Sequence, residues 1–295
     1  HTQLLTKTKA FCACENRYGG MPDTRVCPVC LGLPGAMPRV SKGYVELGAV
    51  AGLALNCDIA AYTKFDRKHY FYPDLAKGYQ ITQYDIPLCK DGFVDLPYIK
   101  LPETSQPGGE NYYDKTFAGE NNNIDNMYKR VRVERIHLEE DVGKSLHLEG
   151  KHSYIDYNRC GTPLIEIVTK PDFRSSDEVI AYLKKLKSSL QFAGISECEE
   201  GAMRCDVNIS VRPEGSTEFG VRSEIKNMSS LSEIKDAIEF EKVRHVDAIE
   251  RHTEMLVQET RRWDDVKRRT FPMRSKETAA DYRYFPDPNV MPIVI

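Results

Sequence analysis

Two close pairs of cysteines near the start of the chain constrain its fold more than any other feature. Cys12 and Cys14 form a C-x-C pair, and Cys27 and Cys30 form a C-P-x-C pair after a short loop. Four thiolates at this spacing can hold one Zn²⁺ in a tetrahedral site. Two disulfides are the alternative, but tight pairs in a chain of enzyme-like length favour a metal. The sequence therefore predicts a closed, structural zinc knuckle within residues 11–31.

The composition indicates a folded protein that does not cross a membrane. The chain has 295 residues, of which 41% are hydrophobic. No apolar run approaches the roughly 18 residues of a membrane-spanning helix. The net charge is −3, so no overall positive field attracts nucleic acid, and an RNA partner would have to meet a local patch. The odd number of cysteines fits a reducing compartment.

Hydrophobic spacing predicts three helices. The first covers residues 42–56 and places its apolar side chains on one broad face: Val45, Leu47, Val50, Leu53 and Leu55. The second begins at Ser175 or Ser176 and ends by Gly194, and the third begins near Ser230.

Strict alternation predicts two strands whose polar faces lie side by side. Residues 204–211 place Arg204 and Asp206 on one face, and residues 221–227 place Glu224 and Lys226 on the matching face. The turn residues between the two segments predict a hairpin, and the hairpin would align the two charged rows.

Two further segments predict strands that carry acids. Residues 163–169 are apolar on both faces except for Glu166, and a buried carboxylate is costly unless it is paired or bound to a metal. Residues 130–141 alternate and end in three consecutive acids. With the acids of the hairpin, these groups resemble a cradle for a magnesium–nucleotide complex. A merely solvated polar face is the alternative, and His137 alone is interpreted as a structural histidine.

Seven long motifs resemble the B-subunit family of aspartyl/glutamyl-tRNA amidotransferases. The resemblance runs over nearly the whole chain. In chain order the motifs are Cys27-Pro-Val-Cys-Leu-Gly-Leu-Pro-Gly, Lys64-Phe-Asp-Arg-Lys-His-Tyr-Phe-Tyr-Pro-Asp, Lys77-Gly-Tyr-Gln-Ile-Thr-Gln-Tyr-Asp, His137-Leu-Glu-Glu-Asp-Val-Gly-Lys, Arg159-Cys-Gly-Thr-Pro-Leu-Ile-Glu-Ile-Val, Met203-Arg-Cys-Asp-Val-Asn-Ile-Ser and Asp281-Tyr-Arg-Tyr-Phe-Pro-Asp-Pro.

The resemblance implies an α+β fold, an antiparallel-sheet cradle similar to glutamine synthetase. It implies one cradle domain over residues 1–295, with the zinc knuckle at 11–31 and a probable loop insertion at 101–128. The family's helical and tail domains, which grip tRNA, would lie outside these residues. We expect the protein to act in the bacterial cytoplasm, or in an organelle matrix if it is eukaryotic.

The implied activity is that of a carbon–nitrogen ligase with glutamine as amido donor. ATP would phosphorylate the side-chain carboxylate of Glu-tRNA(Gln), Asp-tRNA(Asn) or both. Ammonia from an amidase A subunit would then displace the phosphate, in a complex that also holds a small C subunit. Two other interpretations stay open: a non-catalytic scaffold that orients amidase and tRNA, and a free-standing carboxylate–amine ligase.

The resemblance also implies roles for individual residues. ATP, Mg²⁺ and Zn²⁺ are the expected cofactors, and Lys68 is the candidate contact to the transferred phosphate. The remaining assignments are His1, Glu140 and Glu166 as magnesium ligands, Glu140, Asp206 and Glu224 as catalytic acids, Arg204, Asp206, Glu224 and Lys226 as the ATP site, and Cys12, Cys14, Cys27 and Cys30 as zinc ligands.

Overall fold

The structure is a computed structural model that describes residues 1–97, 128–147, 152–199, 201–275 and 281–295. It has mixed α+β architecture with mostly antiparallel sheets, so the α+β part of the expected fold is confirmed. The expected loop insertion at 101–128 lies outside the described residues, apart from Tyr128.

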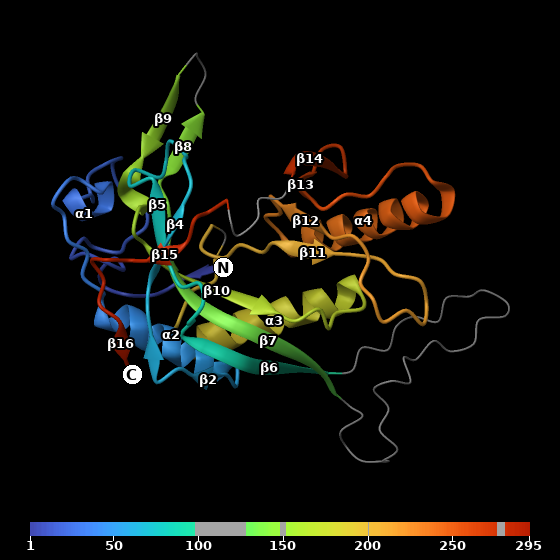
Figure 1. Cartoon of the computed structure of the whole chain (residues 1–295), viewed down its shortest axis with the longest axis horizontal. Helices are drawn as coiled ribbons and strands as arrows, with labels where there is room; N and C mark the ends of the chain where they lie inside the picture. Colours follow the sequence, from blue (N-terminus) through green and yellow to red (C-terminus); the bar gives the residue numbers. More distant parts are fainter. Residues whose placement is uncertain (98–127, 148–151, 200, 276–280) are drawn as a thin grey trace.

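A five-stranded antiparallel sheet forms the centre of the molecule (Figure 1). Its strand order is β1 (Thr2–Gln3), β10 (Pro163–Thr169), β7 (Tyr128–Glu140), β6 (Cys89–Pro97) and β2 (Asp58–Ile59). The strands predicted at 163–169 and 130–141 are therefore confirmed. They lie side by side, and this pairing decides which of their acids can meet.

Two helices cover this sheet: α2 (Lys42–Ala54) and α3 (Ser176–Phe192). Both pack against β6 and against each other. The cap of α3 is Ser175, whose hydroxyl accepts a hydrogen bond from the Glu178 amide at 3.3 Å. Leu183, Leu186 and Leu190 are buried on the inner face of α3, as their helical spacing predicts.

The predicted apolar face of α2 is wrong in part, because small residues face the sheet. Val50 is 38% exposed and Leu53 is 66% exposed. Gly48 and Gly52 are buried instead, and a Cβ atom on Gly52 would lie 2.5 Å from the Sγ of Cys89. The helix axis therefore lies too close to the sheet for large side chains in the centre of the contact.

A second, four-stranded sheet has the order β11 (Val207–Ile209), β12 (Ser223–Lys226), β13 (Glu259–Asp264) and β14 (Arg269–Ser275), and helix α4 (Leu231–Arg251) packs on it. The predicted antiparallel pairing of β11 with β12 is confirmed, although both strands are shorter than the predicted segments. The β12–β13 pair is parallel. The helix predicted near Ser230 is confirmed as α4.

The remaining elements are short. They are α1 (Pro28–Leu31), β3 (Tyr62–Thr63), β4 (Asp66–His69), β5 (Tyr79–Thr82), β8 (Lys144–His147), β9 (Ser153–Asp156), η3 (Tyr157–Arg159), β15 (Phe285–Pro286) and β16 (Ile293–Val294). The β8–β9 hairpin projects from the body of the molecule (Figure 1). Within the described residues, no helix combines the length and apolarity needed to cross a membrane.

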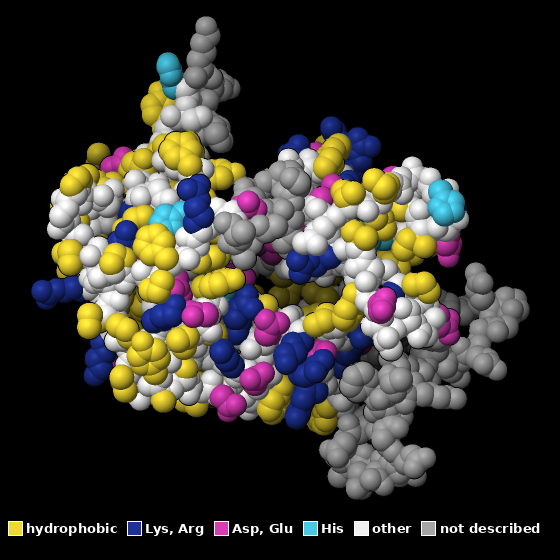
Figure 2. Space-filling view, in the orientation of Figure 1, with side chains coloured by type: hydrophobic (Ala, Val, Ile, Leu, Met, Phe, Trp, Pro, Cys, Tyr) yellow, Lys and Arg dark blue, Asp and Glu magenta, His cyan; other side chains and the backbone are white. Residues whose placement is uncertain are grey.

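Basic and acidic side chains are mixed over the face of the molecule shown in Figure 2. On β6 and β7 some of them form ion pairs, such as Arg130 with Asp95 at 2.8 Å. The mixture agrees with the small net charge of the chain.

Candidate functional site

Three carboxylates from distant parts of the chain lie around the imidazole ring of His1. We call these four residues the acid cluster: His1, Glu139, Glu166 and Asp206. The Nδ1 atom of His1 lies 2.7 Å from a carboxylate oxygen of Glu139 and 3.7 Å from one of Glu166. Its Nε2 atom lies 3.9 Å from Asp206. The ligand atoms of His1, Glu139 and Glu166 all lie within 4.8 Å of one another.

Strand β1 brings the two sheets together at this cluster. It pairs with β10, so that Thr2 lies opposite Ile165. The main chain of His1 also pairs with that of Arg204, because each main-chain nitrogen lies 2.9 Å from the other residue's carbonyl oxygen. Asp206 is therefore held opposite Glu166 by hydrogen bonds on both sides of β1.

In the acid cluster, the effect of neighbouring opposite charges on the pKa values outweighs the effect of burial. Burial lowers the pKa of His1, but Glu139, Glu166 and Asp206 outweigh it and raise the pKa to about 9. Burial raises the pKa of Glu139, but His1 outweighs it and holds that pKa below its ordinary value. The pKa of Glu166 is also lowered, because His137 and His1 outweigh burial. In the absence of a metal, the cluster therefore holds a proton on His1 at neutral pH.

The donor set of the cluster fits a divalent cation. Mg²⁺ prefers carboxylate oxygens and keeps part of its water shell, and Mn²⁺ has similar preferences among oxygen ligands. Glu139 and Glu166 supply such oxygens, and His1 lies between them. His137 lies 3.2 Å from Glu166, and its buried Nδ1 has no hydrogen-bond partner among the described residues. A cation bound here would replace the proton of His1.

Lys226 connects the acid cluster to a further acid on the second sheet. Its Nζ atom lies 2.9 Å from Asp206 and 3.5 Å from Glu224. Glu224 also accepts a hydrogen bond from the Thr260 hydroxyl at 3.0 Å. Burial lowers the pKa of Lys226, but the two carboxylates outweigh it and raise the pKa above its ordinary value. The predicted charged rows of β11 and β12 are thus adjacent.

Two other cations lie near the cluster. Arg204 donates to Asp141 at 3.0 Å. Lys68, on β4, has its Nζ atom 4.5 Å from the centre of the Tyr282 ring, and its charge contributes to the lowered pKa of Glu166. Both cations are therefore placed where an anionic ligand of the cluster could meet them.

The four cysteines of the predicted knuckle also converge, and we call them the cysteine group. The Sγ atom of Cys30 lies 3.6, 3.7 and 3.9 Å from those of Cys12, Cys27 and Cys14. None of the four cysteines forms a disulfide in this structure, a bond that needs sulfur atoms about 2.05 Å apart. The three distances fit the edges of a tetrahedron, since thiolates at about 2.3 Å from a zinc ion would be about 3.8 Å apart. The group can therefore bind a metal such as zinc.

Comparison with known proteins gives the same assignment over the whole chain. A sequence model of the GatB/GatE catalytic domain matches residues 1–295. The chain belongs to the GatB/GatE catalytic domain family. The B subunit of the aspartyl/glutamyl-tRNA(Asn/Gln) amidotransferase from Caldicellulosiruptor saccharolyticus is 48% identical over 298 residues, which are 100% of this chain and 56% of that relative.

Two further relatives give similar values. A B subunit of the same amidotransferase from Clostridium acetobutylicum is 50% identical over 297 residues, which are 100% of this chain and 57% of that relative. The B subunit from Treponema denticola is 49% identical over 298 residues, with coverages of 98% and 56%. This GatB/GatE domain therefore spans little more than half the length of these relatives.

One predicted ligand of this GatB/GatE domain does not join the acid cluster. Glu140 accepts hydrogen bonds from the Lys77 ammonium and the Ile81 amide instead. Glu139 occupies the place in the acid cluster that the sequence predicts for Glu140. The metal-ligand role of Glu140 stays a prediction. Neighbouring strand residues point to opposite faces, and Glu166 lies opposite His137 in the β10–β7 pair. His137 and Glu139 are two residues apart and therefore share a face of β7. This alternation is the feature of the sequence that indicates Glu139 as the member of the cluster.

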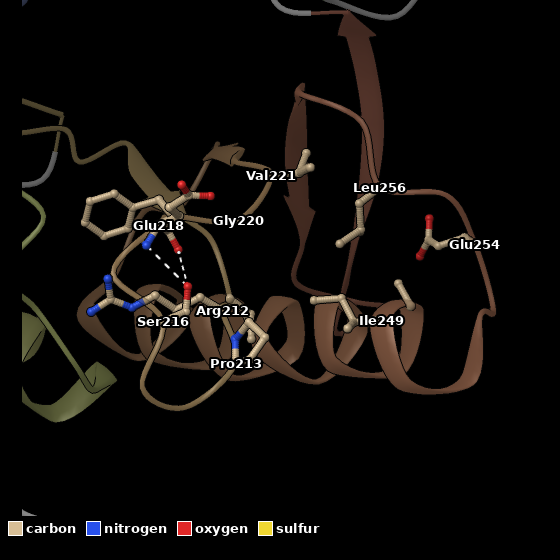
Figure 3. A pocket seen from close by; sticks show the side chains of 12 residues that line it. Arg212, Pro213, Ser216, Glu218, Gly220, Val221, Ile249, Glu254 and Leu256 are labelled. Atoms are coloured by element: carbon tan, nitrogen blue, oxygen red, sulfur yellow. Dashed lines mark hydrogen bonds between the residues drawn. The ribbon is translucent and has the colours of Figure 1, made fainter.

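One surface hollow of this domain lies away from the acid cluster. A cavity of about 400 Å³ opens between residues 211–221 and the end of α4, and Figure 3 shows Ile249 and Leu256 on its walls. Its polar groups include Arg212 and Glu254. None of the predicted site residues lines it, so this cavity is separate from the acid cluster.

Proposed function

We propose that this chain is the ATP-dependent part of a tRNA amidotransferase. It would phosphorylate the side-chain carboxylate of Glu-tRNA(Gln), Asp-tRNA(Asn) or both, and ammonia would then replace the phosphate. The family and the names of its relatives support this proposal. The single observation that carries it is the acid cluster, in which Glu139 and Glu166 of the first sheet and Asp206, directly before β11 of the second, lie around His1.

The chemistry requires an activated carboxylate, because a free carboxylate resists attack by ammonia. Phosphorylation supplies a leaving group, and a bound divalent cation would stabilise the charge on the phosphates. Glu139 and Glu166 would hold the cation together with His1. Asp206, directly before β11, and Glu224, on β12, would orient the nucleotide.

The cationic side chains beside the acid cluster would bind the phosphate groups of the nucleotide. Lys226 and Arg204 are paired with carboxylates in the free protein. Each can exchange that partner for a phosphate oxygen, because an ammonium or guanidinium group binds carboxylate and phosphate in similar ways. Lys68 approaches from β4 and would contact the transferred phosphate.

We propose that the cysteine group holds one structural Zn²⁺. All four cysteines point to one centre, so no open coordination position is left for substrate. We also propose that residues 1–295 form a single cradle domain similar to glutamine synthetase, in which the two sheets bind the nucleotide between them.

The proposed reaction needs partners that supply ammonia and substrate. These are an amidase A subunit, a small C subunit and a misacylated tRNA. The relatives are bacterial proteins named as B subunits, which supports both a multi-subunit complex and a site of action in the bacterial cytoplasm.

A catalytically silent scaffold and a free-standing carboxylate–amine ligase are the alternatives. The acid cluster argues against the scaffold, because its carboxylates and imidazole form a donor set that fits a divalent cation. ATP hydrolysis that depends on a misacylated tRNA would separate the proposal from both alternatives.

Replacement of Glu224 tests the proposal. Glu224→Gln keeps the size of the side chain and removes its charge, so amidation by the complete complex should fall about a hundredfold or more. The loss should be equal with free ammonia and with glutamine. Glutamine hydrolysis at the amidase subunit should continue, because its chemistry lies elsewhere. Glu214→Gln, in the exposed turn between β11 and β12, is the matched control.

A Glu224→Gln complex that amidates normally with free ammonia would contradict the proposal. Glu224 would then serve only the coupling between subunits, and phosphoryl transfer would have to be assigned to other residues.

A further inference from the structure

We infer that Lys77 and Glu140 are positioning residues that connect the cysteine group to the acid cluster. They fix the end of β7, so that Glu139 faces His1. The inference rests on the proposed function, since it concerns a proposed ligand of the cation. It gives Glu140 a role that differs from direct contact with substrate or metal.

Glu140 is held on the side of β7 that faces away from His1. It is 2% exposed, and it accepts hydrogen bonds from the Lys77 ammonium and, at 2.9 Å, from the Ile81 amide. A buried carboxylate with two donors has little freedom, because losing either donor leaves charge unpaired. Since neighbouring strand side chains point in opposite directions, the fixed Glu140 directs Glu139 toward the cluster.

Gln80 provides a second contact between the same segments. Its Nε2 atom donates to the main-chain carbonyl of Glu140 at 2.7 Å and to the carboxylate of Glu139 at 3.3 Å. Gln80 and Ile81 belong to β5, and Lys77 precedes that strand. One short segment, 77–81, therefore holds both acids at the end of β7.

The turn that follows Cys30 of the cysteine group packs on Lys77. Gly32 ends α1 in the left-handed conformation, with φ of 62°, two residues after Cys30. A Cβ atom on Gly32 would lie 2.5 Å from Cγ and 3.0 Å from Cα of Lys77. The turn that follows the last cysteine is thus in contact with the lysine, and any loosening of that turn frees the lysine to move.

A second lysine joins the same two regions. Lys9 is 1% exposed, its Nζ atom donates to the carbonyl of Arg25 at 2.7 Å, and that atom lies 3.5 Å from the Sγ of Cys30. The stem of Lys9 and the carboxylate of Glu140 both lie against Gly161, where a Cβ atom would be 3.6 and 3.7 Å from them. The cysteine group and Glu140 are therefore parts of one packed region.

The test measures Mn²⁺ affinity in the complete protein that carries this chain, by electron paramagnetic resonance of free Mn²⁺. Lys77→Met should raise the Kd for Mn²⁺ by about 10- to 100-fold, the usual effect of losing a residue that orients a metal ligand. Lys77→Arg keeps the charge and should restore much of the affinity. Because a lone buried carboxylate can unfold a protein, the double variant Lys77→Met/Glu140→Gln is measured as well.

Lys129→Met is the matched control. Lys129 lies at the other end of β7 and forms an ion pair with Glu178 on α3. The Lys129→Met variant should bind Mn²⁺ with the same Kd as the wild type. Zinc content, measured by elemental analysis, should be equal in all samples, so that an altered Kd reports the position of Glu139 and not a lost knuckle.

The outcomes separate this inference from the proposed function. If the wild type binds no Mn²⁺, or if Glu166→Gln binds it equally well, the proposed cation site is wrong. If Glu166→Gln weakens binding but Lys77→Met and the double variant bind as the wild type does, the cation site stands and the inference is overturned. Equal losses in Lys77→Met and Lys129→Met would also overturn it, because any change on β7 would then suffice.

Discussion

A fully buried carboxylate on α4 allows a quantitative prediction about the stability of the second sheet. Glu241 has a side-chain exposure of 0%. Its oxygens lie 2.8 Å from Arg244, 3.2 Å from Arg261 and 3.4 Å from His245. The Thr270 hydroxyl donates to it as well. This network ties α4 to β13 through the ion pair with Arg261 and to β14 through the hydrogen bond from Thr270.

The depressed pKa of Glu241 reports the net free energy by which folding favours its charged form. Burial raises the pKa, but hydrogen bonds from His245, Arg244 and Thr270 outweigh it and lower the pKa from 4.5 to about 2. A carboxyl group whose pKa is depressed on folding stabilises the protein above its unfolded-state value. That stability disappears as the pH falls from about 4.5 to about 2, and it amounts to about 3 kcal/mol.

Glu241→Gln should therefore lower the free energy of unfolding by about 3 kcal/mol at pH 7, because two buried guanidinium groups lose a counter-charge. Urea unfolding followed by the fluorescence of Trp263 measures it, since this tryptophan is buried on β13. The gap to the wild type should narrow between pH 4.5 and about 2, where Glu241 is protonated in the unfolded chain but still ionised in the folded protein.

Glu239→Gln is the control, because Glu239 lies on the same helix and is 47% exposed. It should change the free energy of unfolding by less than about 0.5 kcal/mol. The reasoning is refuted if Glu241→Gln costs no more than this control. A gap between Glu241→Gln and the wild type that stays constant from pH 7 to pH 2 would refute it too, since the network would then not depend on the charge.

Two further predictions concern the packing of α2 and the cysteine group. Gly52→Ala should lower the free energy of unfolding by about 1–3 kcal/mol, because its Cβ atom would lie 2.5 Å from the Sγ of Cys89. Gly43→Ala, on the same helix with open space around it, should raise that free energy by up to about 1 kcal/mol, and equal effects in thermal melts would contradict this account. Purified protein should contain one zinc per chain by elemental analysis, and Cys30→Ser should lose it; wild-type protein without zinc would show that the cysteine group binds another metal or none.

The parts of the fold that depend on local pattern were predictable from the sequence. The helix starts at Ser175 and Ser230 follow from capping, and each serine accepts a hydrogen bond from the amide three residues later. The pairing of β11 with β12 follows from alternation and a turn between them. The convergence of the cysteine group follows from ligand spacing alone.

Other features depend on contacts between distant segments. The inner face of α2 is lined by Gly48 and Gly52, because the helix lies close to Leu138 and Cys89 of the first sheet. No helical periodicity of large apolar residues could show this. The parallel pairing of β12 with β13 likewise needs the long crossover through α4, which the hairpin signal did not predict.

The acid cluster also combines residues that the local sequence pattern predicts with one that depends on contacts between distant strands. Glu166 and Asp206 are predictable from the sequence, because one carboxylate interrupts an apolar strand and the other stands in an alternating segment. The prediction of Glu140 in place of Glu139 is not supported, since only one of two neighbouring acids can share a face with Glu166. The choice depends on the register between β7 and β10, which places His137 opposite Glu166.

The position of the cluster explains why its ligands are so far apart in sequence. β1 is only two residues long, yet it pairs with β10 on one side, while the Gln3 amide donates to the Ala202 carbonyl at 2.9 Å on the other. The Thr2 hydroxyl lies 2.7 Å from that of Ser196, which strengthens the same junction. Because Glu166 lies on β10 of the first sheet and Asp206 directly precedes β11 of the second, their mutual repulsion opposes the docking of the sheets until a positive charge lies between them. The proton of His1 supplies that charge in the free protein, and a bound cation would supply more of it.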